Sequence, residues 1–435
     1  MSKSQNLYKK AKTIIPGGNM LLSKRPELFS PSKWPSYFSK TSGCNVWDLD
    51  DNKYTDMSHM GVGTNTLGYN NKSVDTQVKL TIDRGNLSTL NCPEEVELAE
   101  KLIELHDWAD MVRLARTGGE ANSIAIRIAR AASGKDKIAI CGYHGWHDWY
   151  LSANIQSNQN LNDHLLTGLN SNGVPKALEG TAIPFKYNDI NEIREIVKNN
   201  PDLAAIKMEV VRSVEPKKGY LEEIRKICDE NNIILIFDEC TSGFRETYGG
   251  VHKKYKVNPD MCMFGKALGN GYAITAVIGK RNIMDAAQNT FISSTFWTER
   301  IGPTAALATL KEMEKLNSWD IITNQGKYLK NRWSKMASNE GIDISINGMD
   351  ALATFNINSD QWLKYKTFIT ESMLKNGYLA ANVVYLSTKH TDDVINKYID
   401  SMYPIFKKIS EFENGSDSVD NYVKNVCHGG FKRLN

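Results

Sequence analysis

At 435 residues the chain is too long for one simple core, and roughly two or three structural units are expected from typical domain sizes. A hydrophobic share of 41% and a charged share of 24% are those of a globular protein and exclude a largely disordered chain. The 53 Lys and Arg residues nearly balance 50 Asp and Glu, and a net charge of +3 argues against nucleic acid or an anionic membrane as the main partner.

The cysteines and the N-terminal residues bear on metal binding and compartment. Seven cysteines are scattered without a CxxC pair or a Cys/His ligand spacing, so we predict reduced thiols and no metal site. The N-terminal sequence lacks the apolar core of a signal peptide, and no run of about 18 apolar residues occurs. We therefore expect a cytoplasmic protein with no membrane partner.

The N-terminal segment predicts a helix followed by a small antiparallel unit. Residues 4–15 fit an amphipathic helix that stops at the breaker Pro16-Gly17-Gly18. Residues 37–56 are typical of two short strands joined by an Asp-Asp turn, which form a β-meander rather than part of a parallel core. We assign residues 1–55 to this segment.

Helix and strand patterns alternate between about residues 70 and 310. Apolar residues recur at helical spacing in 119–132, and 93–105 is also helix-like. Short apolar strands are expected at 110–116, 137–142, 203–210, 232–239 and 273–279. Strands separated by helices predict βαβ units and a mostly parallel sheet with helices on both faces. We assign this large α/β domain to residues 56–315.

The sequence changes character beyond about residue 310. A long charged helical region over 309–338 precedes an alternating, sheet-like stretch at 343–357. Two more amphipathic helices are expected near 361–375 and 391–412. These patterns predict a separate α+β unit over residues 316–435.

Two motifs stand where expected strands end, which is where ligands gather in open α/β sheets. Thr117-Gly118-Gly119 lies between a strand and a helix, where backbone N–H groups and the positive helix end would hold an anion. Tyr143 and His144 end the next strand in an aromatic cluster that could stack on a flat ligand. An ordinary tight turn and a core aromatic patch are the alternatives.

An acidic pair and a lysine follow two further apolar stretches. Asp238 and Glu239 end a strongly apolar strand, where a carboxylate is costly unless it has a cationic or hydrogen-bonding partner. Lys266 follows the next apolar stretch and precedes a glycine-rich turn. A lysine desolvated there would have a lowered pKa and could act as an amine nucleophile. A structural carboxylate and a surface turn lysine are the alternatives.

The order of the four motifs is more informative than any of them alone. Together they supply an anion cradle, an aromatic lid, a carboxylate and a nucleophilic lysine, which are the parts that pyridoxal phosphate requires. The lysine would form the Schiff base, the carboxylate would keep the pyridine nitrogen protonated, and the glycine turn would bind the phosphate. The sequence therefore predicts pyridoxal 5'-phosphate as the cofactor.

Six segments that span nearly the whole chain match one known family. They are IIPGG at 14–18, TGGEANSIAIRIARAASGKDKI at 117–138, GYHGWHD at 142–148, residues 234–245, FGKALGNGY at 264–272 and YLSTKHTDDVINKY at 385–398. On these residues the chain resembles class III (fold type I) pyridoxal-phosphate aminotransferases, and within them the glutamate-1-semialdehyde 2,1-aminomutase group. The resemblance implies a large, mostly parallel α/β domain and a small α+β domain formed by the N- and C-terminal segments.

Carried over residue by residue, the resemblance implies roles for the motif residues. Lys266 would be the Schiff-base lysine and proton shuttle, Asp238 the partner of the pyridine nitrogen, and Tyr143 the ring-stacking residue. The other implied cofactor-binding residues are Thr117, Gly118, Gly119, His144, Glu209 and Thr295. Thr295 would reach the phosphate of the neighbouring subunit, which implies a homodimer with shared active sites.

Departures from the family pattern fall on substrate and loop positions. Gly119 replaces a threonine of the usual phosphate turn, so one hydroxyl is lost there. Val210 replaces the proline that commonly follows the family's glutamate, and Arg212 comes shortly after it. Arg25 lies one residue away from the position where the aminomutases bind the substrate carboxylate. Arg25 and Arg212 are therefore the candidate substrate-binding residues.

The expected reaction is amino-group transfer between small amino and carbonyl compounds, related to that of the aminomutases. A transferase for another small carbonyl or sugar-like compound, or a racemase or decarboxylase on the same scaffold, is the alternative, because a fold alone does not fix the chemistry. A cofactor-binding protein without turnover is disfavoured by the intact pair of Lys266 and Asp238.

Overall fold

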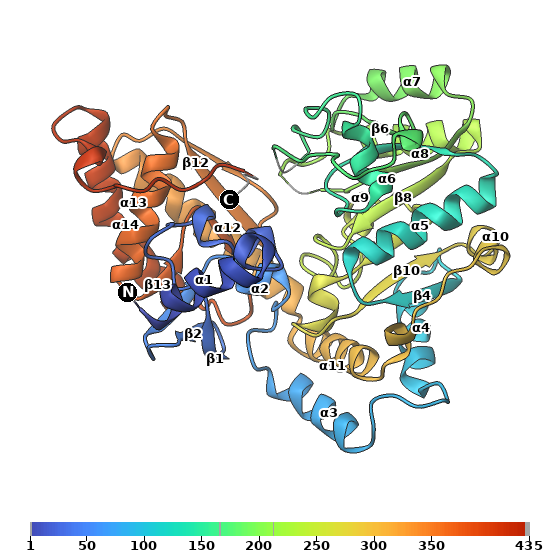
Figure 1. The fold of residues 1–435 in the computed structure, drawn as a ribbon, viewed down its shortest axis with the longest axis horizontal. Helices are drawn as coiled ribbons and strands as arrows, with labels where there is room; N and C mark the ends of the chain where they lie inside the picture. The colour runs from blue at the N-terminus through green and yellow to red at the C-terminus, as the bar shows by residue number, and fades with distance from the viewer. Residues whose placement is uncertain (1, 165–166, 212, 431–435) are drawn as a thin grey trace. The chain divides into compact units, whose positions relative to one another are not determined.

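The computed structural model describes residues 2–164, 167–211 and 213–430. They form two compact units, each with its own apolar core. The central unit runs from Lys72 to Trp319, and the terminal unit combines the chain up to Asn71 with the chain from Asp320 onward. Their elements are labelled in Figure 1.

The central unit contains a seven-stranded sheet with the order β4-β10-β9-β8-β7-β5-β6. Its strands are β4 (Met111–Ala115), β5 (Lys137–Cys141), β6 (Ala182–Pro184), β7 (Leu203–Met208), β8 (Ile234–Glu239), β9 (Met261–Phe264) and β10 (Thr275–Gly279). β10 pairs antiparallel with β4 and β9, whereas the other neighbouring pairs are parallel. The expected mostly parallel sheet is confirmed, and β6 is a strand that the sequence pattern did not indicate.

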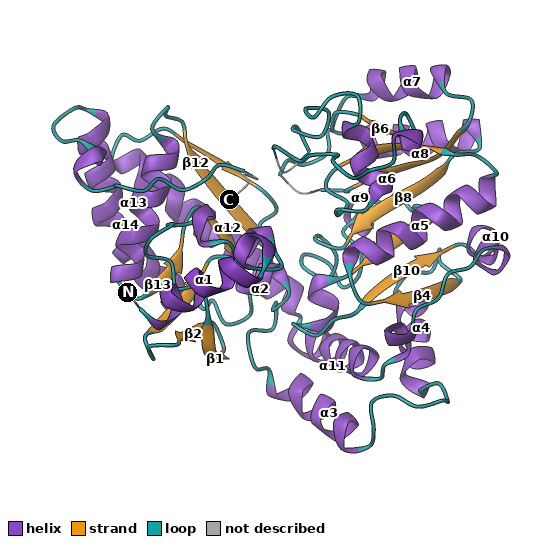
Figure 2. Cartoon of the chain, viewed as in Figure 1, coloured by secondary structure: helices purple, strands orange, loops and turns teal. Residues whose placement is uncertain are grey.

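Helices and 3₁₀ turns surround this sheet, as Figure 2 shows. Among the described residues they are α3 (Lys72–Asp83), α4 (Pro93–Glu104), α5 (Gly118–Ser133), α6 (Asp148–Leu151), η4 (Ser152–Asn154), η5 (Lys176–Leu178), α7 (Ile190–Asn199), α8 (Tyr220–Asn231), α9 (His252–Tyr255), η6 (Lys266–Gly269), α10 (Arg281–Met284), η7 (Asp285–Asn289), η8 (Thr295–Thr298) and α11 (Ile301–Leu316). β7 and β8 are buried along their whole length, which is typical of parallel strands covered on both faces.

Helix α5 begins directly after β4 and covers one face of the sheet (Figure 1). Its first turn is fixed by a capping box, in which the Thr117 side chain accepts from the Glu120 N–H and the Glu120 carboxylate accepts from the Thr117 N–H. Its last turn ends at Gly134, whose left-handed φ of 65° suits glycine. The N-terminus of α5 is therefore fixed at the carboxyl end of β4.

The single helical region expected over 309–338 is two helices. α11 ends at Leu316 and α12 (Ser318–Asn339) begins two residues later. Asn317 between them has φ 49° and ψ 49°, a left-handed conformation that stops an α-helix and that asparagine tolerates better than most residues. The helical periodicity continued across this residue, so the pattern alone did not reveal the break.

The terminal unit joins both ends of the chain in one α+β fold. Its four-stranded sheet has the order β1 (Phe38–Ser42), β2 (Asn45–Asp48), β3 (Lys53–Met57) and β13 (Tyr378–Ala380), and its three-stranded sheet has the order β11 (Ile344–Asn347), β12 (Leu352–Ile357) and β14 (Val383–Tyr385). The parallel pairing of β13 with β3 connects the C-terminal segment to the predicted meander.

Helices complete the terminal unit and supply most of its core. They include α1 (Lys3–Ile14), η1 (Pro16–Gly18), η2 (Leu22–Lys24), η3 (Pro26–Leu28), α2 (Met60–Gly63), α12, α13 (Trp362–Lys375), α14 (Asp392–Glu413) and η9 (Val419–Asn421). Trp333 of α12 is fully buried against Phe355 of β12, and Phe406 of α14 packs on the same phenyl ring.

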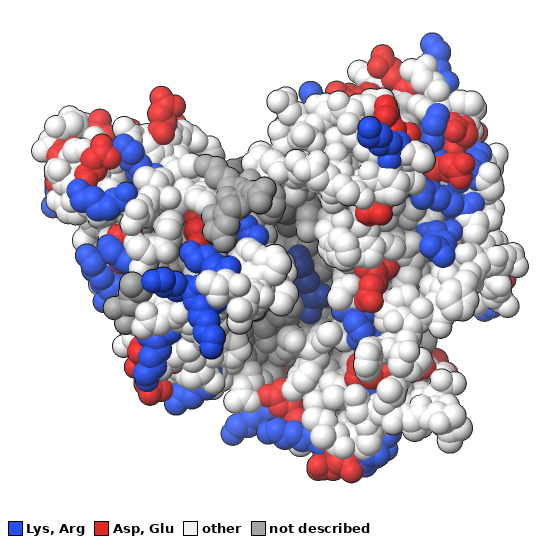
Figure 3. Space-filling view, in the orientation of Figure 1, with Lys and Arg blue, Asp and Glu red and all other residues white. Residues whose placement is uncertain are grey.

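The surface matches the nearly balanced charge of the sequence. Figure 3 shows Lys and Arg side chains interspersed with Asp and Glu over the visible face of each unit. Within the described ranges, no helix has both the length and the apolar character needed to cross a membrane.

A close backbone contact in the terminal unit gives a stability prediction. A Cβ added to Gly326 of α12 would lie 1.9 Å from the carbonyl oxygen of Asp350. We expect Gly326→Ala to lower the free energy of unfolding by about 2 kcal/mol, because overpacking outweighs the helix-propensity gain of up to about 1 kcal/mol. Urea unfolding checks this, with the exposed Asn331→Ala on the same helix as a control that should change little. A more stable Gly326→Ala protein would contradict the close contact.

Candidate active site

The candidate site lies along one edge of the central sheet. β5, β7, β8 and β9 are parallel neighbours, so their carboxyl ends meet at the same edge. β4 runs in the same direction, because two antiparallel pairings separate it from β9. The predicted residues that stand at or just after these strand ends are Thr117, Gly118, Gly119, Tyr143, His144, Glu209, Asp238 and Lys266. The fold therefore brings all of them to one edge.

The centre of the site is the buried carboxylate of Asp238, which is 4% exposed. Its Oδ2 atom accepts from Nδ1 of His144 at 2.8 Å and from Nζ of Lys207 at 3.4 Å, and Oδ1 accepts from the backbone N–H of Cys240 at 3.1 Å. Burial raises the pKa of Asp238, but Lys207, His144 and the Cys240 N–H outweigh burial and hold this pKa well below its usual value. Asp238 is therefore ionised at neutral pH.

His144 supports Asp238 from a fully buried position. Burial and the neighbouring Lys207 lower the pKa of His144, so the ring is neutral and its proton lies on Nδ1, facing the carboxylate. The ring also stacks with Trp149 and meets the edge of Tyr150. These contacts fix the imidazole, and the imidazole in turn fixes the orientation of Asp238.

The two adjacent acidic residues have different surroundings. Successive side chains of a strand point to opposite faces of the sheet. The Glu239 carboxylate therefore faces away from Asp238, where it accepts from Nδ1 of His252 at 2.6 Å. Trp108 donates its indole N–H to the other ring nitrogen of His252, so both nitrogens of this ring have hydrogen-bond partners. Asp238, rather than Glu239, is the acidic residue of the site.

Lys266 follows β9 in a left-handed backbone conformation with φ 37°. Such a conformation is costly for a residue with a side chain and is found mostly at functional sites. Its Nζ atom donates to Oγ1 of Thr241 at 2.7 Å. Because Thr241 lies three residues after Asp238, this bond places the amine at the end of the neighbouring strand that carries the carboxylate.

The glycine turn before α5 has the donors of an anion site. The side-chain cap uses the N–H groups of Thr117 and Glu120. Within the part of the chain that the structure describes, the N–H groups of Gly118 and Gly119 meet no acceptor, as expected for the first residues of a helix. A Cβ built on Gly118 would have only Cys240 Sγ near it, at 3.8 Å, so the space in front of this residue is open.

Glu209 holds the loop that carries Tyr143. The buried Glu209 carboxylate accepts from the Tyr143 N–H at 3.1 Å. A Cβ on Gly142 would lie 2.6 Å from a carboxylate oxygen of Glu209, and φ at Gly142 is 118°, so only glycine fits there. The Tyr143 ring is partly buried and meets the edge of Tyr150.

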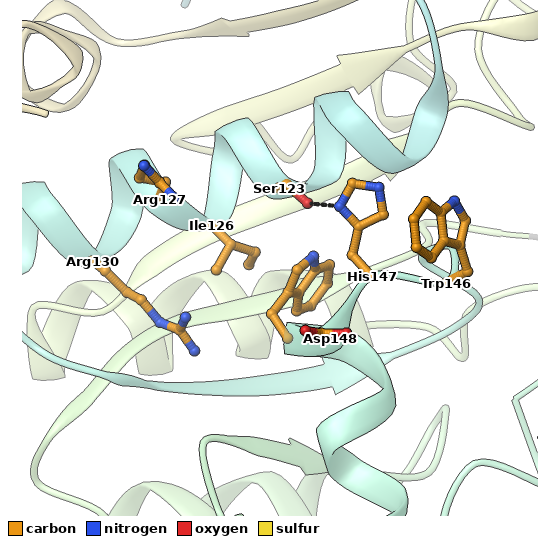
Figure 4. A pocket seen from close by; sticks show the side chains of 8 residues that line it. Ser123, Ile126, Arg127, Arg130, Trp146, His147 and Asp148 are labelled. Atoms are coloured by element: carbon orange, nitrogen blue, oxygen red, sulfur yellow. Dashed lines mark hydrogen bonds between the residues drawn. The ribbon is translucent and has the colours of Figure 1, made fainter. Parts of the chain in front are cut away.

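His147 lies beside Ser123 of α5, as Figure 4 shows. Its Nδ1 atom lies 2.5 Å from Oγ of Ser123 on α5, and a Cβ on Gly119 would lie 2.9 Å from its Nε2 atom. His147 shares a surface pocket with Arg127, Arg130 and other residues of α5 and the 146–149 segment. A threonine side chain at 119 would collide with this ring, which explains why glycine occupies the position.

Three predicted residues are not brought to this cluster by the described contacts. Thr295 lies exposed in η8, near Trp297, whose indole donates to Glu120 at the start of α5. Arg25 belongs to the terminal unit, where its guanidinium lies against Gly17. Arg212 lies outside the described residues.

Two residues of the site were not identified in the sequence. Lys207 lies fully buried in β7, and Thr241 is buried after β8. A lysine inside the otherwise apolar stretch Leu203–Met208 is visible in the sequence and could have been singled out. Thr241 had no such signal, because its importance comes only from the contact with Lys266.

Comparison with known proteins decides the family. The family model described as aminotransferase class-III matches residues 30–402. The chain belongs to this family. The recognition made from the sequence motifs is thereby confirmed, and with it the expectation of an enzyme from a family that uses pyridoxal phosphate.

The similar curated proteins have two kinds of name. The 3-aminobutyryl-CoA aminotransferase of Cloacimonas acidaminovorans is 32% identical over 90% of this chain and 94% of its own length. The glutamate-1-semialdehyde 2,1-aminomutase of Nitrosopumilus maritimus is 31% identical over 94% of this chain and 100% of its own length.

Solved structures with the same fold include the PLP internal aldimine form of the FumI protein of Sphingopyxis sp. MTA144, with a TM-score of 0.86 and 23% identity over 95% of this chain and 97% of that chain. An omega-transaminase from Sphaerobacter thermophilus has a TM-score of 0.82 and 23% identity over 93% of this chain and 97% of its own. The fold class expected from the sequence is confirmed.

The buried ion pair gives a prediction that needs no cofactor. Asp238→Ala would leave Lys207 buried without its counter-charge, so we expect the cofactor-free protein to lose about 3–5 kcal/mol of unfolding free energy. The control is Asp202→Ala, which removes a half-exposed ion pair with Lys137 and should cost about 1 kcal/mol or less. Urea unfolding compares the two, and equal small losses would mean that the Asp238 pair does not form.

Proposed function

We propose that this chain is a pyridoxal-phosphate-dependent enzyme that transfers an amino group, with Lys266 as the covalent anchor of the cofactor and Asp238 as the partner of its ring nitrogen. The observation that carries the proposal is the presence of an ionised buried carboxylate, a positioned amine and an open N–H turn along one sheet edge. These groups supply a partner for each polar part of the cofactor.

The residues of the site fit the cofactor by their chemistry. The N–H groups of Gly118 and Gly119, at the positive end of α5, would hold the phosphate, and the Thr117 cap keeps them in place. Tyr143 would stack on the ring, in a loop that Glu209 fixes. When bound, the cofactor draws electrons from the substrate carbon that carries the amine.

Lys266 would move the proton of the reaction. The hydrogen bond that Nζ donates to Oγ1 of Thr241 positions the amine at this edge of the sheet. Once its amine is released from the cofactor, Nζ would take the proton from the substrate carbon and return a proton in the next step. The first transfer requires the neutral amine, which a site that limits water around Nζ favours, and the second uses the proton that Nζ then carries.

Asp238 would hold the proton on the ring nitrogen. The carboxylate is ionised and already oriented by His144, so little reorganisation is needed when a cation arrives beside it. An aspartate that stays charged in a buried site provides the electrostatic stabilisation that the electron-withdrawing ring requires.

The names of the relatives support a small amino or carbonyl compound as substrate. We infer an activity related to glutamate-1-semialdehyde 2,1-aminomutase, which rests on the aminomutases among the similar proteins. The 3-aminobutyryl-CoA aminotransferase at 32% identity favours the alternative, a two-substrate transferase for another carbonyl compound. Racemase and decarboxylase chemistry stay open on the same scaffold. Arg25 and Arg212 remain the proposed substrate-binding residues.

A homodimer with shared active sites belongs to the same proposal. Thr295 would contribute to the phosphate site of the neighbouring subunit, since η8 lies exposed and is tied through Trp297 to the first turn of α5.

The anchor assignment predicts loss of covalent attachment in Lys266→Ala. The wild-type protein should turn yellow with pyridoxal phosphate and, after borohydride reduction, carry the cofactor on the peptide that contains Lys266. The variant should lose this adduct and at least about 10³-fold of its turnover, which is the scale of losing a nucleophile and proton carrier. The exposed Lys198→Ala serves as a matched control and should behave as wild type. An adduct that persists on another lysine would overturn the assignment.

The reaction type is tested by adding one amine at a time to the loaded protein. Conversion of the absorbance to that of the pyridoxamine form by glutamate or alanine is expected of a two-substrate transferase. A response to glutamate semialdehyde or 4,5-diaminovalerate, with none to common amino acids, is expected of an aminomutase. Loss of α-carboxylate as carbon dioxide, or racemisation without amino transfer, would instead identify the other chemistries.

A further inference from the structure

The described structure contains a second lysine next to the proposed cofactor site. Lys207 is 0% exposed and lies in β7, between the apolar Ile206 and Met208. Its Nζ atom is 3.4 Å from Oδ2 of Asp238 and 3.6 Å from Sδ of Met263. A lysine without exposure is rare and costly unless it is paired.

The strand register explains how the two side chains meet. Lys207 pairs with Ile236 of β8, and Asp238 lies two residues further along the same strand. Side chains two residues apart point to the same face, so Lys207 and Asp238 share the face covered by α5. Met263 pairs with Asp238 in the register of β8 and β9, and its sulfur atom contacts the lysine amine.

Asp238 is the anion that Lys207 contacts, because the other titratable groups near the lysine are neutral. Cys240 and Cys262 also lie within electrostatic range of Lys207, but burial raises the pKa of both thiols well above the usual value, so they are neutral. His144 faces it from the end of β5, and that ring is neutral as well. Burial lowers the pKa of Lys207, whereas Asp238 opposes this effect.

We propose that Lys207 is a positioning residue that shares the Asp238 carboxylate with the ring nitrogen of the cofactor and so weakens the hold of that carboxylate on the ring proton. The proposal rests on the function proposed above. A protonated ring nitrogen is a second cation beside one carboxylate whose Oδ2 already accepts from Lys207 and His144. In a site with little water, two like charges that share one anion repel more strongly than they would in water.

The consequence is a cofactor ring that gives up its proton at a lower pH than it would without Lys207. The lysine thereby limits how strongly the ring withdraws electrons, and it adjusts the pH range of the reaction without touching substrate. A lysine that only fills space or balances charge for folding would leave the proton affinity of the bound cofactor unchanged.

The test is a pH titration of the ring nitrogen of the bound cofactor, followed by the ¹⁵N NMR shift of pyridoxal phosphate labelled at that nitrogen, in wild type and Lys207→Met. Methionine keeps a linear side chain of similar length and removes the charge, while Asp238 retains the donors of His144 and Cys240. We expect the midpoint of the titration to rise by about one pH unit, which is a tenfold gain in proton affinity. The dissociation constant for pyridoxal phosphate, measured by dialysis, should fall or stay unchanged.

Matched variants separate charge from packing. Lys207→Arg keeps the charge and should keep a midpoint close to that of wild type, and Lys207→Gln serves if Lys207→Met does not fold. Lys366→Met in α13 of the terminal unit replaces another lysine whose pKa is lowered by burial, and it should leave the midpoint unchanged.

Two outcomes overturn different claims. A midpoint that is the same in wild type, Lys207→Met and Lys207→Gln, in proteins that all bind the cofactor, overturns the role of Lys207 and leaves the proposed function intact. A wild-type protein that stays colourless with pyridoxal phosphate overturns the proposed function, and the inference falls with it.

Discussion

The charge of one buried carboxylate organises the candidate site. Asp238 is removed from water and yet ionised, which is possible only because His144, Lys207 and the Cys240 N–H all donate to it. Each donor comes from a different place in the sheet: the end of β5, the interior of β7 and the turn after β8. The parallel sheet is therefore the means by which a single charge receives two partners that are distant in the sequence, in addition to a local N–H group.

Two kinds of positively charged or partly positive group lie along this edge of the sheet. The N-terminus of α5 presents backbone N–H groups that cannot lose their protons, whereas Lys207 and Lys266 are amines whose charge depends on their surroundings. A fixed donor suits a permanent anion such as a phosphate. An amine whose proton can leave, as proposed for Lys266, suits the reacting carbon. Asp238 accepts a hydrogen bond from one of these amines, the buried Lys207.

Much of this site could be predicted from strand ends, and some of it could not. Thr117, Tyr143, Asp238 and Lys266 stand at or after the ends of apolar strands, so the rule that ligands lie at carboxyl ends placed them together, whereas Glu209 was indicated by the family resemblance. Lys207 was missed because its partner belongs to a neighbouring strand, and the register between strands is not written in local periodicity. The helix break at Asn317 was missed for a similar reason, since one left-handed residue leaves the apolar spacing intact. The domain boundaries after residues 55 and 315 stay predictions, whereas the two compact units change over after Asn71 and Trp319.

The parallel pairing of β13 with β3 has a consequence for how the polypeptide is made. A chain emerging from the ribosome presents its N-terminal strands first, while the strand that completes their sheet is still untranslated. The Lys72–Trp319 segment is contiguous and can collapse on its own core as soon as it has been released. Strands β1 to β3, which are synthesised before the central unit, are thus among the last to reach their native neighbours, and their exposed strand edge must stay free of other chains in the meantime.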